Sequence, residues 1–191
     1  MKQIILASAS PRRKKLLEQI GLKFTVVVNK HQEKMNPRLK PRGQAEFLSK
    51  QKAQAIVDRY KNAIIIAADT LVVFNDQIIG KPTSPYDAKR ILRMLSGKTH
   101  RVITGYTIID TATKKSLTYS VETLVFMKKM SIKEVDAYIK TGEPLDKAGG
   151  YGANEKGALF VEKIAGDFFN VVGLPIFAVA QDLKKFGIGM F

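Results

Sequence analysis

The sequence contains no cysteine and no tryptophan, and it has only two histidines, His31 and His100. Disulfide bonds and thiolate metal sites are therefore excluded. The two histidines are distant and lack the spacing of zinc signatures, so we expect both to be surface or structural residues. Acidic residues are also scarce, because 17 Asp and Glu stand against 32 Lys and Arg, for a net charge of +15. This excess favours an anionic partner, whether a nucleotide, a nucleic acid or an acidic surface.

Long apolar runs are missing as well, and so are several common nucleotide-binding and catalytic motifs. No stretch is long enough to span a membrane, and the N-terminal apolar run of about five residues is too short for a signal peptide. The patterns G-x-x-x-x-G-K-[ST], G-x-G-x-x-G and G-x-S-x-G are absent, which argues against P-loop, Rossmann and α/β-hydrolase sites. With 45% hydrophobic residues the chain can bury a sizeable core, and we expect a single domain over residues 1–191. The absence of cysteine fits a reducing cytosol, so we expect a cytoplasmic protein without membrane contact.

The N-terminal segment carries the strongest local signal. An apolar strand at residues 3–8 leads directly into two serines, a proline and four consecutive cations. We expect Ser10 to cap a helix and Pro11 to be its first residue. The amide groups of such a helix start, together with Arg12 and Arg13, suit a phosphate group. A capped helix whose basic first turn simply faces solvent is the alternative.

The rest of the chain alternates strand and helix patterns. The most apolar run, residues 63–74, ends at the turn residues Asn75 and Asp76 and predicts a central strand pair that opens into a hairpin. Other expected elements are strands at 24–28, 101–109, 117–127 and 158–164, and helices over 45–56, from Ser84, from the capping box of Ser131 and Glu134, and after Pro175. Together they predict a mixed, strongly curved sheet with flanking helices.

Three further groups of residues are candidates for chemistry. Asp69 ends an apolar strand, where a carboxylate is costly unless it is paired, hydrogen-bonded or bound to metal. Lys81 is fixed between a glycine and a proline and offers a point charge for phosphate, although a surface loop lysine is an equal alternative. The glycines of residues 144–152 permit close approach to a ligand or unusual turn angles. For Asp69 the alternative is a carboxylate that caps a turn.

In order and spacing, these segments resemble the Maf family of nucleoside triphosphate pyrophosphatases. The resemblance spans essentially the whole chain and rests on Ser8-Ala9-Ser10-Pro11-Arg12-Arg13, Glu33, Gln51-Lys52-Ala53, Ala68-Asp69-Thr70, Gly80-Lys81-Pro82, Leu95-Ser96-Gly97, Asp146-Lys147-Ala148-Gly149 and Val172-Gly173-Leu174-Pro175. It implies an α/β fold of the inosine-triphosphatase-like kind, with two lobes around a deep cleft that holds a triphosphate.

Within that family, the chain is similar to the branch that acts on dTTP and UTP. That branch has Arg after the proline, Asp-Thr at the strand end and Tyr-Gly after the glycines. In this chain Arg12, Thr70 and Tyr151 occupy the matching positions. The 7-methyl-GTP branch instead has Trp after the proline and Asp-Gln at the strand end. One departure is visible, because Tyr-Gly-Ile-Gln-Gly is replaced by a segment with Asn154 and Glu155. Asn154 keeps the amide but is one methylene shorter.

The resemblance implies hydrolysis of the triphosphate to a monophosphate and pyrophosphate, with Mg²⁺ or Mn²⁺ as cofactor. The implied catalytic residues are Asp69, Glu33, Lys52 and Lys81, the substrate-binding residues are Ser8, Arg12, Arg13, Thr70 and Asn154, and the metal ligands are Glu33 and Asp69. In this scheme Asp69 is the general base, the cations neutralise the phosphates, and Thr70 and Asn154 read the base.

A regulatory protein that binds nucleotide or nucleic acid without turnover is the alternative function. It would use the same net charge, although the sequence has no basic motif interleaved with aromatic residues of the kind that binds single strands. We therefore do not expect nucleic acid as the partner. A homodimer is compatible with the sequence, which does not fix the oligomeric state.

Overall fold

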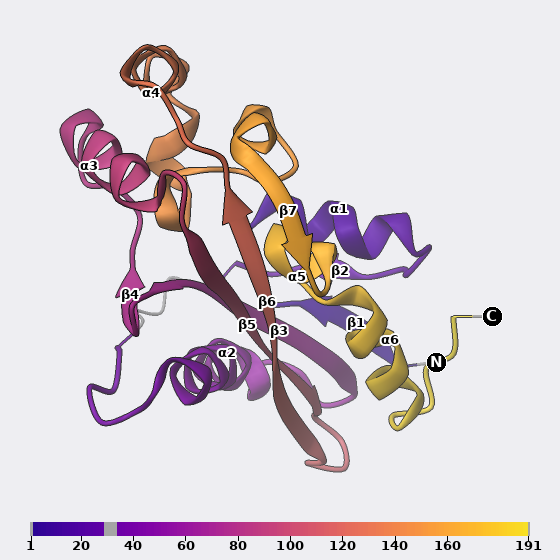
Figure 1. The fold of residues 1–191 in the computed structure, drawn as a ribbon. Helices are drawn as coiled ribbons and strands as arrows, with labels where there is room; N and C mark the ends of the chain where they lie inside the picture. Colours follow the sequence, from indigo (N-terminus) through magenta and orange to yellow (C-terminus); the bar gives the residue numbers. More distant parts are fainter. Residues whose placement is uncertain (1, 29–33, 191) are drawn as a thin grey trace.

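The computed structural model describes residues 2–28 and 34–190. Within them the chain forms a seven-stranded sheet with helices on both sides (Figure 1). The strands are β1 (Gln3–Leu6), β2 (Thr25–Val26), β3 (Ala63–Phe74), β4 (Gln77–Ile79), β5 (Thr99–Asp110), β6 (Ser116–Met127) and β7 (Val161–Ala165). The helices are α1 (Pro11–Gln19), α2 (Pro41–Val57), α3 (Pro85–Leu95), α4 (Ile132–Ile139), α5 (Phe168–Val172) and α6 (Ile176–Lys184), with short 3-10 turns at Glu143–Asp146, Ala148–Gly150 and Lys156–Phe160.

The sheet is mixed, as the sequence predicts. Its main strand order is β2-β1-β3-β5-β6-β7, and β4 pairs with β3 outside this path. The β1 strand runs parallel to both β2 and β3, whereas β3, β5, β6 and β7 are successively antiparallel. The long strands β3, β5 and β6 twist strongly across the molecule (Figure 1). The predicted curved sheet with flanking helices is therefore confirmed.

An interruption along one edge of β3 positions the candidate site. β5 pairs with residues 64–73 on one edge, so β1 and β4 share the other edge. On that edge β1 reaches residues 63–66 and β4 covers residues 72–74, and no described strand covers the residues between. Asp69 and Thr70 lie in this gap. Because they are consecutive residues of a strand, their side chains point to opposite faces of the sheet.

Because side chains along β3 point alternately to the two faces of the sheet, the core forms two layers. Ile65 and Ala67 pack with apolar residues of α2 on one face. Ile64 and Ile66 pack on the other face with residues of α1 and α6, including Leu17. Figure 1 shows α2 on one side of the sheet and α1, α5 and α6 on the other. Asp69 therefore shares the α2 face, and Thr70 shares the α1 face.

A separate apolar cluster covers the far end of the long strands. Val72, Val102 and Val125 pack there with apolar residues of α3 and α4, such as Leu92 and Tyr138. The helices α3 and α4 lie together at the top of the molecule in Figure 1. Among the described helices, none is long and apolar enough to cross a membrane.

The helix starts follow the sequence prediction. The Ser10 hydroxyl caps α1 by accepting from the amide of Arg13, and Pro11 is the first residue of that helix. Ser84 caps α3 in the same way, and the predicted capping box joins Ser131 to Glu134.

Several strand predictions need correction. The expected strand pair within residues 63–74 is one continuous strand, because β1 and β5 hold its first half between them while β5 continues to pair with its second half. The hairpin to β4 does form, with positive φ angles at Asn75 and Asp76. The expected strand at 158–164 begins at Val161, because Lys156–Phe160 forms a 3-10 turn. The strand expected at 24–28 is shorter in the structure, where β2 covers only Thr25–Val26. The helix α5 was not predicted from the sequence.

Candidate active site

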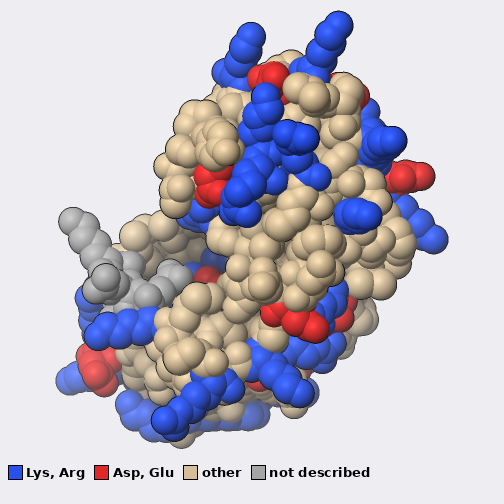
Figure 2. Space-filling model, turned by 60° about the vertical axis from the view of Figure 1, so that its left-hand side comes forward, with Lys and Arg blue, Asp and Glu red and all other residues tan. Residues whose placement is uncertain are grey.

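A cleft opens at the interrupted edge of β3. It has two adjoining parts with volumes of about 210 and 310 Å³, and the same five residues line both parts. These shared residues are Ser10, Arg12, Arg13, Lys52 and Lys81. Figure 2 shows the face of the molecule hollowed between the upper region with α3 and α4 and the lower region with α2. The two parts therefore belong to one cleft that several cations surround.

The larger part is enclosed by residues 7–11, where β1 leads into α1. The side chains of Arg12, Lys52 and Lys81 also line it, and Asp146 is the acidic residue among the described lining groups. A helix N-terminus beside several cations provides both amide donors and positive charge. This part of the cleft is suited to a polyanion such as a chain of phosphates.

Asp69 and Lys52 form a close ion pair at the floor of the cleft. The nitrogen Nζ of Lys52 lies 2.5 Å from Oδ1 of Asp69, and Asp69 is only 7% exposed. Lys52 projects from α2 toward the β3 gap. The second carboxylate oxygen, Oδ2, accepts no hydrogen bond from a described residue. Asp69 therefore has one oxygen held by a cation and another available to a water molecule or a ligand.

On the other face of β3, Arg13 organises the wall of the cleft. Its Nε donates to the carbonyl of Gly173 at 2.8 Å, and its two terminal nitrogens donate to the hydroxyls of Ser8 and Thr70 at 3.3 and 3.0 Å. The Thr70 hydroxyl also contacts that of Thr104 at 2.9 Å. Arg13 is buried, and these contacts join α1, β3 and the end of α5. They give both Arg13 and Thr70 a structural task that their sequence context does not reveal.

Ser8 keeps a donor toward the cleft. Its hydroxyl oxygen accepts from the amide of Ser10 at 3.2 Å and from Arg13. Both contacts use lone pairs of the oxygen, so the hydroxyl hydrogen is left for another acceptor. This arrangement is compatible with the hydrogen bond to phosphate that the sequence predicts for Ser8.

Lys81 lies at the rim where the two parts of the cleft meet. Its side chain is exposed, and it forms no ion pair with a described residue. The carbonyl of Gly80 accepts from the amide of Gly149 at 3.1 Å, which joins the lysine's loop to the glycine-rich segment. The backbone that precedes Lys81 is thus held against the glycine-rich segment, and Lys81 itself lines the cleft.

The smaller part of the cleft combines charged groups with apolar side chains. Val72, Val102, Ala153 and Tyr151 contribute to its lining, and Asn154 adds an exposed amide. These groups could surround a flat ring and contact its edge.

The predicted structural role of His100 is confirmed. It is 2% exposed, and its Nε2 lies 2.7 Å from the hydroxyl of Tyr151 behind the cleft. Burial lowers the pKa of His100 to about 4. His31 lies outside the described residues.

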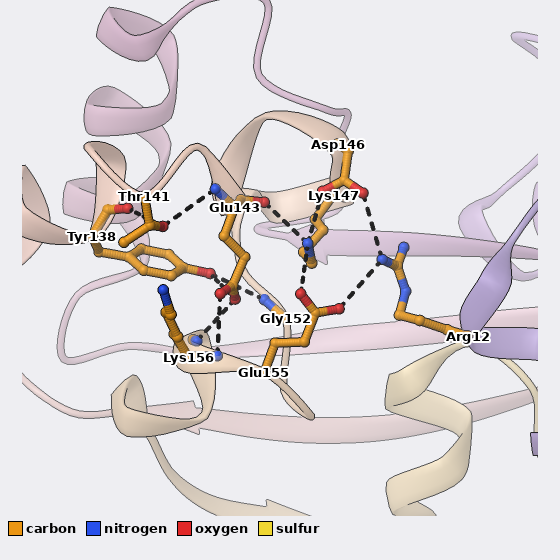
Figure 3. Close-up of polar contacts among 10 residues, drawn as sticks. Arg12, Tyr138, Thr141, Glu143, Asp146, Lys147, Gly152, Glu155 and Lys156 are labelled. Atoms are coloured by element: carbon orange, nitrogen blue, oxygen red, sulfur yellow. Dashed lines mark hydrogen bonds and ion pairs between the residues drawn. The ribbon is translucent and has the colours of Figure 1, made fainter. Parts of the chain in front are cut away.

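The segment that carries Asn154 is held by Glu143, a residue that the sequence did not single out. One carboxylate oxygen of Glu143 accepts from the Tyr138 hydroxyl at 2.7 Å and from the amide of Gly157 at 3.0 Å (Figure 3). A Cβ atom at Gly157 would lie 2.6 Å from that tyrosine oxygen, so only glycine fits there. No local pattern signals these contacts, because Glu143 binds groups on both sides of the glycine-rich segment.

Arg12 contacts two carboxylates of the same segment. One terminal nitrogen of Arg12 lies 3.7 Å from Asp146 and 3.8 Å from Glu155 (Figure 3). Lys147 contacts the same two carboxylates at 2.7 and 3.1 Å. Burial would raise the pKa of Asp146, but the hydrogen bond and charge of Lys147 and the charge of Arg12 outweigh it and lower that pKa. Sequence reasoning gave no role to Glu155.

Apart from Glu33, every residue predicted for the site lines the cleft: Ser8, Arg12, Arg13, Lys52, Asp69, Thr70, Lys81 and Asn154. Glu33 lies outside the described residues, so the expected pairing of Glu33 with Asp69 stays a prediction. The structure brings together residues from β1, α1, α2, β3 and the glycine-rich segment that are far apart in the sequence.

Comparison with known proteins gives a consistent result. A family model described as Maf-like protein matches residues 3–186. A dTTP/UTP pyrophosphatase of Methanosarcina barkeri is 46% identical and aligns over 100% of this chain and 98% of its own length. Proteins of the same name from Alkaliphilus metalliredigens and Bacillus cereus are 47% and 45% identical, covering 97% and 98% of this chain and 96% and 92% of their own.

A solved structure supports the fold. The Ham1 protein of Staphylococcus aureus superimposes with a TM-score of 0.56 over 96% of this chain and 99% of its own, at 11% identity. At that identity the likeness concerns the fold alone, and it agrees with the fold that the resemblance implied. Together with the family match over nearly the whole length, these findings establish that the chain belongs to the family of Maf-like proteins.

Proposed function

We propose that this protein is a nucleoside triphosphate pyrophosphatase that hydrolyses dTTP and UTP to the monophosphate and pyrophosphate. The observation that carries the proposal is the Asp69–Lys52 pair at the floor of a cleft lined by cations. The names of the similar full-length proteins support the same substrates. In this proposal the triphosphate lies in the larger part of the cleft and the base in the smaller part.

Charge and hydrogen bonding support the placement of the triphosphate. Arg12 and Lys81 both line the larger part of the cleft, and the start of α1 adds backbone donors. Pyrophosphate gains negative charge as it leaves, so cations fixed beside it stabilise the transition state more than the ground state. Ser8 contributes one further donor through its hydroxyl hydrogen.

In the proposed reaction, a water molecule attacks the α-phosphorus and its proton passes to Oδ2 of Asp69. The bond between the α-phosphorus and the bridging oxygen breaks, and pyrophosphate leaves with that oxygen. Lys52 holds the other carboxylate oxygen at 2.5 Å, which fixes the orientation of the base during proton transfer. Lys52 thus positions Asp69 and adds positive charge near the phosphates.

The residues present fit a divalent metal such as Mg²⁺ or Mn²⁺. Among the described residues no group of three or more acidic or histidine side chains is placed to hold a metal. Mg²⁺ nevertheless commonly binds through one or two carboxylates together with substrate phosphates, and the Asp69 carboxylate could be one of these ligands. A bound ion would neutralise phosphate charge and polarise the phosphoryl oxygen. Glu33 is the second ligand that we propose.

Base selection in this proposal depends on the smaller part of the cleft. Val72 and Val102 offer apolar surface to the ring, and the amide of Asn154 can both donate to and accept from its edge. The Thr70 hydroxyl already binds Arg13 and Thr104, so Thr70 contributes mainly through the shape of the wall. We also propose that the reaction takes place in the cytoplasm, where nucleoside triphosphates serve nucleic acid synthesis.

The proposal is tested by pyrophosphate release from a panel of nucleotides, with Asp69→Asn as the matched variant. We expect dTTP and UTP to give the highest kcat/KM, and Asp69→Asn to lower kcat by about 10²–10⁴-fold because an amide cannot accept the proton. Unchanged activity of Asp69→Asn would refute the assignment of the base. Absence of turnover combined with salt-dependent binding to nucleic acid would favour the regulatory alternative.

A further inference from the structure

Arg12 belongs to a closed ring of four charges at the cleft, which Arg12, Asp146 and Lys147 line. Asp146 binds Lys147 through Oδ1 and Arg12 through Oδ2. Glu155 binds Arg12 through Oε1 and Lys147 through Oε2. Figure 3 shows the two carboxylates lying between the two cations, with Arg12 entering from α1. Each carboxylate therefore bridges both cations, and the ring joins α1 to the segment that carries Asn154.

The burial of the members shows which part of the ring is rigid. The Lys147 side chain is only 6% exposed, and its ammonium group also donates to the carbonyl of Glu143 at 3.1 Å. The Glu155 side chain is 38% exposed and that of Asp146 is 68% exposed. Lys147 is thus the fixed anchor, and Glu155 is the better shielded of the two carboxylates that hold Arg12.

We propose that Glu155 is a positioning residue for nucleotide binding: anchored by Lys147, it holds the Arg12 guanidinium at the cleft. This inference rests on the proposed function, in which Arg12 binds the triphosphate. A free arginine side chain has many rotamers, and binding a phosphate would have to order it. An arginine that is already oriented loses less entropy when the nucleotide arrives, which strengthens binding.

The physical alternative is that Glu155 only repels the nucleotide. A carboxylate beside a polyanion is unfavourable, but here each oxygen of Glu155 faces a cation and the ring as a whole is neutral. Its charge is therefore largely compensated inside the ring. The two views predict opposite changes in nucleotide affinity when the carboxylate is removed. Loss of positioning would weaken binding, whereas loss of repulsion would strengthen it.

The experiment is a double-mutant cycle with Glu155→Ala, Arg12→Ala and the double variant. Binding of inorganic tripolyphosphate is measured by calorimetry with Mg²⁺ present, and kcat and KM are measured for UTP. Glu155→Ala should raise the tripolyphosphate Kd and the UTP KM by about 2- to 12-fold, the range for ordering one long side chain. Any fall in kcat should be smaller than that of Arg12→Ala, because the Arg12 cation that faces the leaving pyrophosphate is still present in Glu155→Ala.

The cycle distinguishes positioning from a general structural effect. If Glu155 acts through Arg12, the double variant should bind tripolyphosphate as Arg12→Ala does. Glu155→Gln, which keeps the shape and one acceptor oxygen but loses the charge and the second acceptor, should be intermediate. Glu162→Ala, a change of an exposed glutamate on β7, is the control and should match the wild type. Additive losses in the double variant, tighter binding by Glu155→Ala, or no tripolyphosphate binding by the wild type would each overturn the proposal.

Failure of the proposed function would look different. A wild type that binds tripolyphosphate but hydrolyses no nucleotide would refute the pyrophosphatase activity, and the calorimetric cycle would still decide the role of Glu155. A wild type that hydrolyses UTP but gives an additive cycle would refute the positioning role alone.

Discussion

Gly105 should be essential for bringing α2 close enough to the sheet to build the site. It lies directly opposite Asp69 in the pairing of β5 with β3. A Cβ atom at this position would lie 2.2 Å from both the carbonyl carbon and the carbonyl oxygen of Ala45 in α2. These are backbone atoms that no rotamer change can move, so in Gly105→Ala the helix itself must shift. An ordinary contact requires the helix to retreat by about 1 Å or more.

Two measurable losses follow from that shift. Overpacking of this kind costs about 1–3 kcal/mol, which lowers Tm by roughly 2–12 °C for a chain of this size. The retreat of α2 also lengthens the contact between Lys52 and Asp69 from its present 2.5 Å, beyond the usual hydrogen-bond range if the lysine does not fully compensate. A displacement of about 1 Å at a catalytic group can cost 10²-fold, so kcat should fall by up to about that factor.

Gly43→Ala in the same helix is the matched control. Its Cβ would meet only side-chain atoms of Leu39, at 3.7 and 3.8 Å, and alanine is the better helix residue by roughly 0.5–1 kcal/mol. We therefore expect Gly43→Ala to melt at or above the wild-type temperature with full activity. Thermal melting and pyrophosphate release test both variants. If Gly105→Ala retained wild-type Tm and kcat, the argument that this glycine sets the position of α2 would be wrong.

Three further predictions concern charge, pH and metal. Lys81→Ala should lower kcat/KM by about 10²–10³-fold, because it removes a cation that stabilises the transition state. Lys14→Ala loses only a surface ion pair with Glu18, so its kcat/KM should change little. Equal effects of the two variants would indicate a diffuse electrostatic surface. Since burial lowers the pKa of His100 from 6.5 to about 4, the unfolded chain binds the extra proton in this interval, and stability should fall by about 3 kcal/mol as pH drops through it. Denaturant unfolding at several pH values should show that the free energy of unfolding depends less steeply on pH in His100→Phe than in the wild type. The same pH dependence in both proteins would assign the effect to other groups. EDTA should abolish hydrolysis and Mg²⁺ or Mn²⁺ should restore it, while full activity in EDTA would point to a mechanism carried by the lysines.

The parts of the site that depend on local signals could be predicted from the sequence. Ser10 and Pro11 mark a helix start through capping chemistry that acts within a few residues, and the structure has the helix there. Asp69 stands out because a carboxylate follows a run of apolar residues, and β3 indeed buries it beside the cleft. In both cases the sequence pattern and the physical cause lie in the same short segment.

The parts that depend on distant contacts could not be predicted in this way. Arg13 carries the same local signal as its neighbour Arg12, yet the fold turns it inward to the Gly173 carbonyl, 160 positions later. Lys52 was assigned through the resemblance, since its pairing with Asp69 requires the close approach of α2 that Gly105 allows. Glu155 meets Arg12 only when the glycine-rich segment folds back across the cleft. Such contacts follow from the tertiary fold, which no local window contains.

The contact between Arg13 and Gly173 also determines when during synthesis the cleft can be completed. A ribosome produces the chain from its N-terminus, so α1 emerges long before the end of α5. Until residue 173 has left the exit tunnel, the Arg13 guanidinium lacks the carbonyl that fixes its Nε, and the wall beside Thr70 stays open. A nascent chain, or one truncated before α5, therefore carries Asp69 and Lys52 without a finished nucleotide pocket. The cleft that we propose for the nucleotide is therefore completed only after residue 173 has been synthesised and folded against α1.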